Sequence, residues 1–299
     1  MDLRRGPHGS GRVPEAAQTP RIKPEIALSE VDRVRAAGTR FGLVLTDAGH
    51  GCSATSRAGL SARGLAWAAG VPSNVKVYPA DVKLLPAELK PGRPSNFLLP
   101  DKASELAEAV LGRAKWRSVT WRSGTKGRLR ARFAAARVRV ADGPTRRIGG
   151  KANQHLPGDE EVWLVGEHRA SGERKYYLSN LPPKASLRRL ASAIKARWVC
   201  EQAHQQVKEE LGLDHFEGRS WTGLHRHALM TMLAYAFLQH RRLARARRGK
   251  KAEGGPATTP ADPSGRAPGH AGQPGPAPHT LPALRSASPP CIIGLNVPK

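Results

Sequence analysis

The chain has 299 residues, an apolar fraction of 39% and a formal net charge of +25. This length favours one or two domains, and the 31 Gly and 25 Pro residues indicate that part of the chain does not pack into a core. Three widely spaced cysteines argue against a zinc site or a disulfide framework, and no apolar run reaches the roughly 18 residues of a membrane span. These features exclude membrane-spanning and disulfide-rich classes and predict a cytoplasmic protein.

The charge predicts a polyanionic partner. The chain has 49 Lys and Arg against 24 Asp and Glu. Such an excess favours nucleic acid first and an acidic membrane surface second. A genome whose codon usage favours Arg, Ala, Gly and Pro would produce the same bias. Basicity alone therefore does not decide the function.

The first part of the chain has the pattern of an α/β protein. Residues 1–22 show no periodicity and are predicted to be disordered. "PEIALSEVDRVRAAG" is typical of an amphipathic helix that ends at a glycine. "FGLVLTDAGHG" indicates a buried strand with Asp47 at its carboxyl end, where α/β sheets commonly deliver polar groups. A helix in "SATSRAGLSARG" and a strand in "LAWAAGV" follow, and this order predicts a mostly parallel sheet.

The character changes after residue 73. From about 73 to 180, alternating apolar and polar residues predict antiparallel β-structure, with "EHRASGERKYY" as a hairpin. Residues 185–212 are predicted to form one helix stopped by a glycine, and residues 223–248 a second helix with a basic end. Residues 249–299 are rich in Pro, Gly and Ala and are predicted to be a disordered tail.

Two features carry candidate functional residues. The first is a polar stripe at helical spacings of 4, 7 and 11 residues: Arg197, Glu201, His204 and Lys208. A solvated helix face would give this pattern, but so would a metal-binding carboxylate beside phosphate-binding cations. The apolar residues around the stripe favour a helix packed on several sides. The second feature is Asp47, which is either a turn former or a catalytic group at a strand end.

These residues resemble a known signature. The spacing Arg197-x3-Glu201-x6-Lys208 resembles the R-x3-E-x6-K part of the Y-R-E-K signature of DDE transposases from bacterial insertion sequences. "VLTDAGHG" resembles the strand that carries their second catalytic Asp. Two further segments, residues 121–127 and 198–230, resemble blocks of one branch of that group. The resemblance spans residues 22–248. It implies an α/β, partial RNase H-like fold, with a β-rich insertion at about 73–180 between the second Asp and the Glu helix.

The resemblance implies a chemistry as well. It predicts DNA transposition by metal-dependent phosphodiester cleavage and strand transfer on double-stranded DNA, both transposon ends and target, at the bacterial nucleoid. Asp47 and Glu201 would hold Mg²⁺ or Mn²⁺ in a site of two ions about 3.5–4 Å apart. Arg197 and Lys208 would contact DNA phosphates. Trp121 would stack on an unpaired base or pack in the core. No membrane partner is expected.

Two departures from the signature affect this prediction. The signature's Tyr should stand three residues before Arg197, where the chain has Ile194. A first catalytic Asp is also required upstream, yet only 46 residues precede Asp47 and none of their acidic residues ends an apolar strand. We therefore expect an N-terminally truncated catalytic domain with an incomplete two-ion site and no activity. A sheet without its opening strands would have an unpaired edge and poor solubility.

Two other functions are compatible with these observations. The chain could be a non-catalytic DNA-binding or regulatory remnant that binds transposon ends or an intact transposase, or forms a homodimer. A general RNA-binding protein would rest on charge alone, because the sequence has no RRM or KH signature and only 5% aromatic residues.

Overall fold

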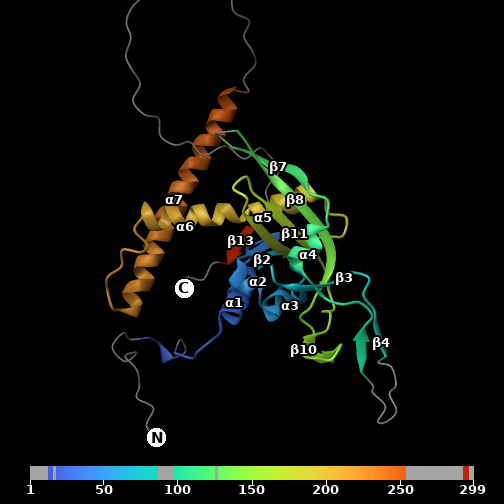
Figure 1. Cartoon of the computed structure of the whole chain (residues 1–299). Helices are drawn as coiled ribbons and strands as arrows, with labels where there is room; N and C mark the ends of the chain where they lie inside the picture. The colour runs from blue at the N-terminus through green and yellow to red at the C-terminus, as the bar shows by residue number, and fades with distance from the viewer. Residues whose placement is uncertain (1–12, 16–17, 87–96, 125–126, 254–291, 296–299) are drawn as a thin grey trace, which may run out of the picture. The chain divides into compact units, whose positions relative to one another are not determined.

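The computed structural model describes residues 13–15, 18–86, 97–124, 127–253 and 292–295 (Figure 1). They fall into two compact units. The sheet unit comprises the described residues of 19–202 and 287–299, and the helical unit those of 1–18 and 203–286.

A mixed sheet of nine strands forms the centre of the sheet unit. Its order is β13-β1-β2-β12-β11-β8-β3-β6, with β7 also paired to β8. Two small antiparallel pairs, β4 with β5 and β9 with β10, complete the described strands. The bounds are β1 (Leu43–Thr46), β2 (Trp67–Val71), β3 (Lys76–Pro79), β4 (Leu84–Pro86), β5 (Leu98–Pro100), β6 (Glu105–Leu106), β7 (Arg117–Gly124), β8 (Gly127–Val140), β9 (Thr145–Ile148), β10 (Lys151–His155), β11 (Glu161–His168), β12 (Arg174–Ser179) and β13 (Ile292–Leu295).

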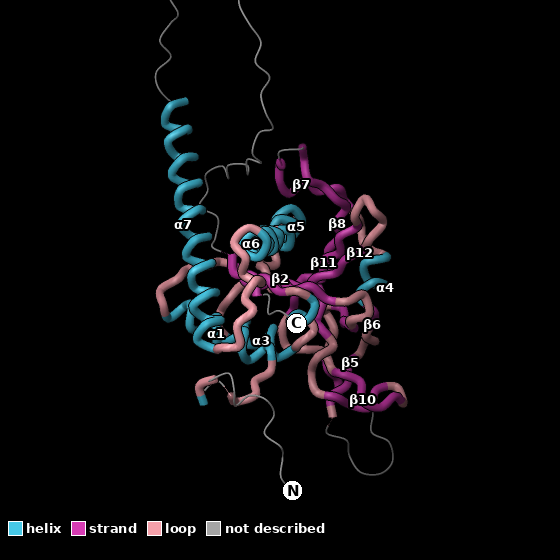
Figure 2. Tube along the Cα trace, turned by 90° about the vertical axis from the view of Figure 1, so that its left-hand side faces the viewer, coloured by secondary structure: helices cyan, strands magenta, loops and turns pink. Residues whose placement is uncertain are grey.

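Helices cover both faces of this sheet (Figure 2). One face packs against α1 (Lys23–Ala36), α3 (Ala54–Ala62) and α4 (Ala107–Gly112), and includes the buried side chains of Val44 and Trp67. The other face packs against α5 (Leu187–Lys195). Because successive strand residues point to opposite faces, each buried strand supplies both cores.

The predicted α/β class is confirmed, and the arrangement is consistent with a partial RNase H-like fold. The strand predicted before Asp47 is β1, and it runs parallel to β2, so that Leu45 lies opposite Ala68. The predicted hairpin is the β11–β12 pair, whose turn contains Gly172 at φ 85°. Between β3 and β12 the described strands pair antiparallel, as the alternating pattern predicted.

The single helix predicted over residues 185–212 is two helices. α5 ends at Lys195, and α6 (Arg197–Glu209) begins two residues later. No Gly or Pro stands at this break, so it has no local signal in the sequence. The last residue of α5 is instead held by a tertiary ion pair, from Lys195 to Glu167 on β11.

The C-terminal segment also departs from its prediction. Within the tail predicted to be disordered, Ile292–Leu295 form β13, which pairs parallel with β1. The edge of β1 that was expected to be unpaired therefore has a partner. Consecutive isoleucines suit a strand, and an open sheet edge offers backbone groups to such a segment. The remainder of the predicted tail beyond residue 253 lies outside the described residues.

The helical unit contains the second half of α6 and the long helix α7 (Trp221–Glu253). α7 covers the predicted helix 223–248 and extends it at both ends. Gly212, at φ 70°, follows α6 as predicted. A short helix, α2 (Ala48–Gly51), follows β1 and was not predicted. In the described part of the chain, no helix combines the length and the apolar character that a membrane crossing requires.

Candidate functional site

Asp47 lies where β1 ends and α2 begins. It is the N-cap of α2, and its side chain accepts a hydrogen bond from the backbone N–H of His50 at 3.2 Å. The turn is packed closely on β2, because a Cβ at Gly51 would lie 1.9 Å from the carbonyl oxygen of Gly70. Any side chain at Gly51 would displace α2. This glycine therefore fixes the position of Asp47 relative to the sheet.

The surroundings of Asp47 favour its ionised form. Partial burial opposes ionisation, but the backbone and ring hydrogen bonds of His50 and the charge of Arg197 together lower the pKa of Asp47 below its usual value. The His50 ring is buried, with Nδ1 at 3.2 Å from Asp47 Oδ1. Its Nε2 atom has no hydrogen-bond partner among the residues that the structure describes. Asp47 is thus a carboxylate that remains partly exposed and charged.

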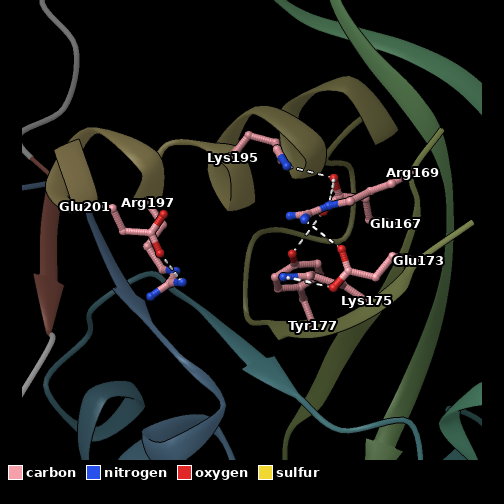
Figure 3. Close-up of polar contacts among 8 residues, drawn as sticks. All are labelled: Glu167, Arg169, Glu173, Lys175, Tyr177, Lys195, Arg197 and Glu201. Atoms are coloured by element: carbon pink, nitrogen blue, oxygen red, sulfur yellow. Dashed lines mark hydrogen bonds and ion pairs between the residues drawn. The ribbon is translucent and has the colours of Figure 1, made fainter. Parts of the chain in front are cut away.

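Arg197 links the two carboxylates that the sequence singled out. It is the first residue of α6, its charge acts on Asp47, and its guanidinium is ion-paired with Glu201 one turn further along the helix. Figure 3 shows this pair on α6. Glu201 is 46% exposed. Arg197, Glu201 and Asp47 therefore belong to one electrostatic neighbourhood of the sheet unit.

A second polar group, not predicted from the sequence, is centred on a buried carboxylate. Glu167 on β11 is 1% exposed and contacts Lys195 Nζ at 2.7 Å, Arg169 Nε at 3.2 Å and the Tyr177 hydroxyl at 3.0 Å (Figure 3). Burial raises the pKa of Glu167, but Lys195, Arg169 and Tyr177 outweigh it, so the pKa is lowered overall. We call these four residues the Glu167 cluster.

The Glu167 cluster adjoins the α5–α6 corner. Lys195 is the last residue of α5, and Arg197 opens α6. The pKa of Tyr177 is raised by burial first and by Glu167 next, while Arg169 and Arg197 lower it. Arg197 is therefore close enough to act on Tyr177 as well as on Asp47. A sequence signal for Glu167 did exist, because period-two alternation places it on the same strand face as Trp163 and Val165.

Trp121 lies at an irregularity of the β7–β8 hairpin. The pairing register shifts between Thr120 and Arg122, as it does at a β-bulge. The Trp121 ring meets Phe133 edge-on at 5.7 Å and lies 5.0 Å from Lys195 Nζ. Arg122 lies 4.8 Å from the ring of Trp198 on α6. These contacts fit the core alternative for Trp121. They do not test base stacking.

The rest of the polar stripe is solvated. His204 and Lys208 are exposed, and Lys208 lies in the half of α6 that belongs to the helical unit. The expectation that this helix is packed on several sides is wrong, since Trp198 and Val199 are 44% and 50% exposed and Val207 is its one buried residue among those described. Ile194, in place of the signature's Tyr, is buried in the core beneath α5.

The donor set at this site does not fit a complete two-ion centre. Asp47 is engaged by His50, and Glu201 by Arg197. Among the described residues, no three His, Cys, Asp or Glu side chains come together as a metal-ligand group. Two divalent ions need several carboxylate oxygens held in fixed geometry. At this site the described chain offers two carboxylates, Asp47 and Glu201, each with a competing partner.

Comparison with protein families gives a match. Residues 8–128 match a family model described as DDE superfamily endonuclease. The matched segment contains β1, Asp47 and β7, and it ends before α5 and α6. A comparison with curated proteins found no match.

Proposed function

We propose that the chain is a DDE-type, transposase-like protein that acts in DNA transposition, with metal-dependent phosphodiester cleavage and strand transfer as its ancestral reaction. The match to DDE superfamily endonucleases over residues 8–128 supports a nuclease that acts on DNA, and enzymes of that family generally use divalent metal ions. The observation that carries the proposal is the position of Arg197, which acts on Asp47 and is paired with Glu201. The cation that is paired with the helix-borne carboxylate thus also lowers the pKa of the strand-end carboxylate.

Each predicted residue has a role in this proposal. Asp47 and Glu201 are the ligands for Mg²⁺ or Mn²⁺. Arg197 and Lys208 contact DNA phosphates, as Arg and Lys do in most protein–DNA interfaces. Trp121 would either stack on an unpaired base or serve only in the core contacts described above. For Glu201 to bind metal, its ion pair with Arg197 must open, and a phosphate arriving at Arg197 would compensate for the lost partner.

The incomplete donor set favours a second candidate function. With two carboxylates at the candidate site and no group of three metal ligands among the described residues, this chain by itself binds DNA without cutting it. It would then be a regulatory remnant that occupies transposon ends or associates with an intact transposase or with a second copy. Both candidates share DNA as partner and differ in chemistry.

Strand cleavage separates the two candidates. The purified chain is incubated with DNA that carries the ends of its transposon and with supercoiled plasmid, in Mg²⁺ or Mn²⁺. The variants Asp47→Asn and Glu201→Gln are tested in parallel. We expect all three proteins to bind duplex DNA. We expect the unmodified chain to cleave no more DNA than the two variants do. Metal-dependent cleavage that Asp47→Asn abolishes would disprove the regulatory candidate and support strand transfer. Loss of all duplex binding would contradict both.

A further inference from the structure

Three arginines form a straight row on β8. Arg128, Arg130 and Arg132 alternate with Leu129, Ala131 and Phe133, and the latter two belong to the core beneath α5. Because successive strand residues point to opposite faces, the arginines project from the face turned away from α5. All three are exposed. We call them the arginine row.

Hydroxyl residues of β7 complete this face. In the antiparallel register, Ser118 lies opposite Arg132, Thr120 opposite Arg130 and Ser123 opposite Arg128. Directly opposite residues project to the same side of a two-stranded ribbon. The hairpin face is therefore a double line of guanidinium and hydroxyl groups. Figure 2 shows β7 and β8 extending beyond β11.

Among the described residues, the arginine row has no neutralising partner. Some other arginines of the sheet unit are paired with carboxylates, as Arg57 is with Asp142 at 2.5 Å and Arg137 with Glu161 at 2.6 Å. In the part of the chain that the structure describes, no ion pair or side-chain hydrogen bond involves a guanidinium group of the row. Three like charges at alternate positions of one strand repel each other and do not stabilise the fold. The row is thus explained better by an external anion than by folding.

The spacing of the row fits a phosphate backbone. Alternate residues of an antiparallel strand lie about 6.8 Å apart, twice the roughly 3.4 Å axial rise per phosphate along one DNA strand. Arginine with Ser and Thr hydroxyls is also the usual set of phosphate contacts in protein–DNA interfaces. We propose that this hairpin face is a binding site for the backbone of double-stranded DNA, separate from the Asp47–Arg197–Glu201 site.

Such a site binds duplex without reading its sequence. A flat row of guanidinium groups contacts phosphates and reaches no base edge, so it positions DNA rather than selecting it. The site rests on the proposed function only in having DNA as its partner. It requires neither metal nor cleavage, and it can be tested with both absent.

The test is the salt dependence of duplex binding by the full chain in EDTA. Log affinity falls as log salt rises, and each neutralised phosphate makes this slope steeper by about 0.9. The triple variant Arg128→Gln, Arg130→Gln and Arg132→Gln removes the row. Its slope should be shallower by about 2.7. Between about 50 and 200 mM salt, the unmodified chain should then lose about 40-fold more affinity than the variant.

Matched variants make the result specific. Lys23→Gln, Arg40→Gln and Lys83→Gln remove the same charge from exposed positions outside the hairpin and should leave the slope nearly unchanged. Replacing the row by three lysines should retain it. The proposal would be overturned if the row variant and the control variant with three substitutions outside the hairpin lost equal amounts of slope. A row variant that loses affinity for single-stranded RNA or for vesicles of anionic lipid but not for duplex DNA would overturn it too. Cleavage plays no part in this measurement, which is made in EDTA, so failure of the cleavage proposal is distinguishable from failure of this one.

Discussion

At the scale of single residues, Glu167 is the side chain with the clearest energetic role. Its carboxylate holds the end of α5 through Lys195 and is hydrogen-bonded to Tyr177 on the neighbouring strand β12. Arg197 follows Lys195 by two residues, so the same contact helps to fix where α6 begins. Removing the carboxylate would leave a partly buried ammonium group without its anion. Glu167 is therefore a positioning residue for the corner that carries Arg197.

Glu167→Gln should destabilise the chain by about 3 kcal/mol, because breaking a buried ion pair from one side leaves the other charge uncompensated. Urea unfolding at neutral pH measures this change. Glu173→Gln is the matched control, since Glu173 also pairs with Arg169 but is 48% exposed. Its cost should be below about 1 kcal/mol, as for other surface pairs. Equal costs for the two variants would contradict the role given to Glu167.

The ion pair of Glu167 with Lys195 also predicts how stability depends on pH. The pKa of Glu167 is lowered in the folded chain from an ordinary value of 4.5. A carboxyl with a lowered folded pKa contributes stability above its unfolded pKa, and that contribution is lost as pH falls through the folded value. The difference in unfolding free energy between the unmodified chain and Glu167→Gln should therefore be constant above about pH 5 and shrink in acid.

At the scale of elements, the pairing of β1 with β13 predicts which amides exchange slowly. The Val44 amide donates to the Ala66 carbonyl at 2.9 Å, toward β2. Backbone groups of adjacent residues in a strand point to opposite edges, so the amides of Leu43 and Leu45 face β13. Ending the chain after residue 291 should speed hydrogen exchange at Leu43 and Leu45 and leave Val44 protected.

A chain ending after residue 295 is the control, because it retains β13 and should exchange as the full chain does. Hydrogen exchange followed by NMR resolves the individual amides. Unchanged protection of Leu45 after removal of β13 would show that the edge of β1 does not depend on that strand.

The elements also show what the sequence could predict. The strand before Asp47, its parallel partner β2 and the β11–β12 hairpin followed from local periodicity and turn residues. The break between α5 and α6 did not, because it depends on a contact between Lys195 and a residue 28 positions earlier. The pairing of β13 with β1 joins segments about 250 residues apart, which no local pattern records.

The same division holds for the candidate site. Asp47 could be located from its strand end, and Arg197 with Glu201 from helical spacing, because these signals are local. The competition of His50 for Asp47 was not foreseen, although an Asp three residues before a His at a helix start permits such a cap. Glu167 was missed because its importance lies in burial and partners, which tertiary packing decides.

At the scale of the whole molecule, the formal net charge of +25 is the largest electrostatic feature. Ion pairs such as Arg33 with Glu30, Arg63 with Asp32 and Arg137 with Glu161 neutralise single cations locally, and the excess cations repel one another across the surface. Self-repulsion of this kind destabilises a compact chain. Salt screens it, because the Debye length falls to about 10 Å at 0.1 M ionic strength.

Salt should therefore change stability in opposite directions with and without DNA. Without DNA, the melting temperature of the full chain should rise with potassium chloride, by about 2–4 °C for each kcal/mol of repulsion removed. With excess duplex, mass action stabilises the folded chain, and this added stability should shrink as salt weakens binding. Differential scanning calorimetry with and without duplex gives both curves. Potassium glutamate should act as chloride does if the effect is screening. A melting temperature that falls with salt in the absence of DNA would mean that local pairs, such as Glu167 with Lys195, outweigh the net repulsion.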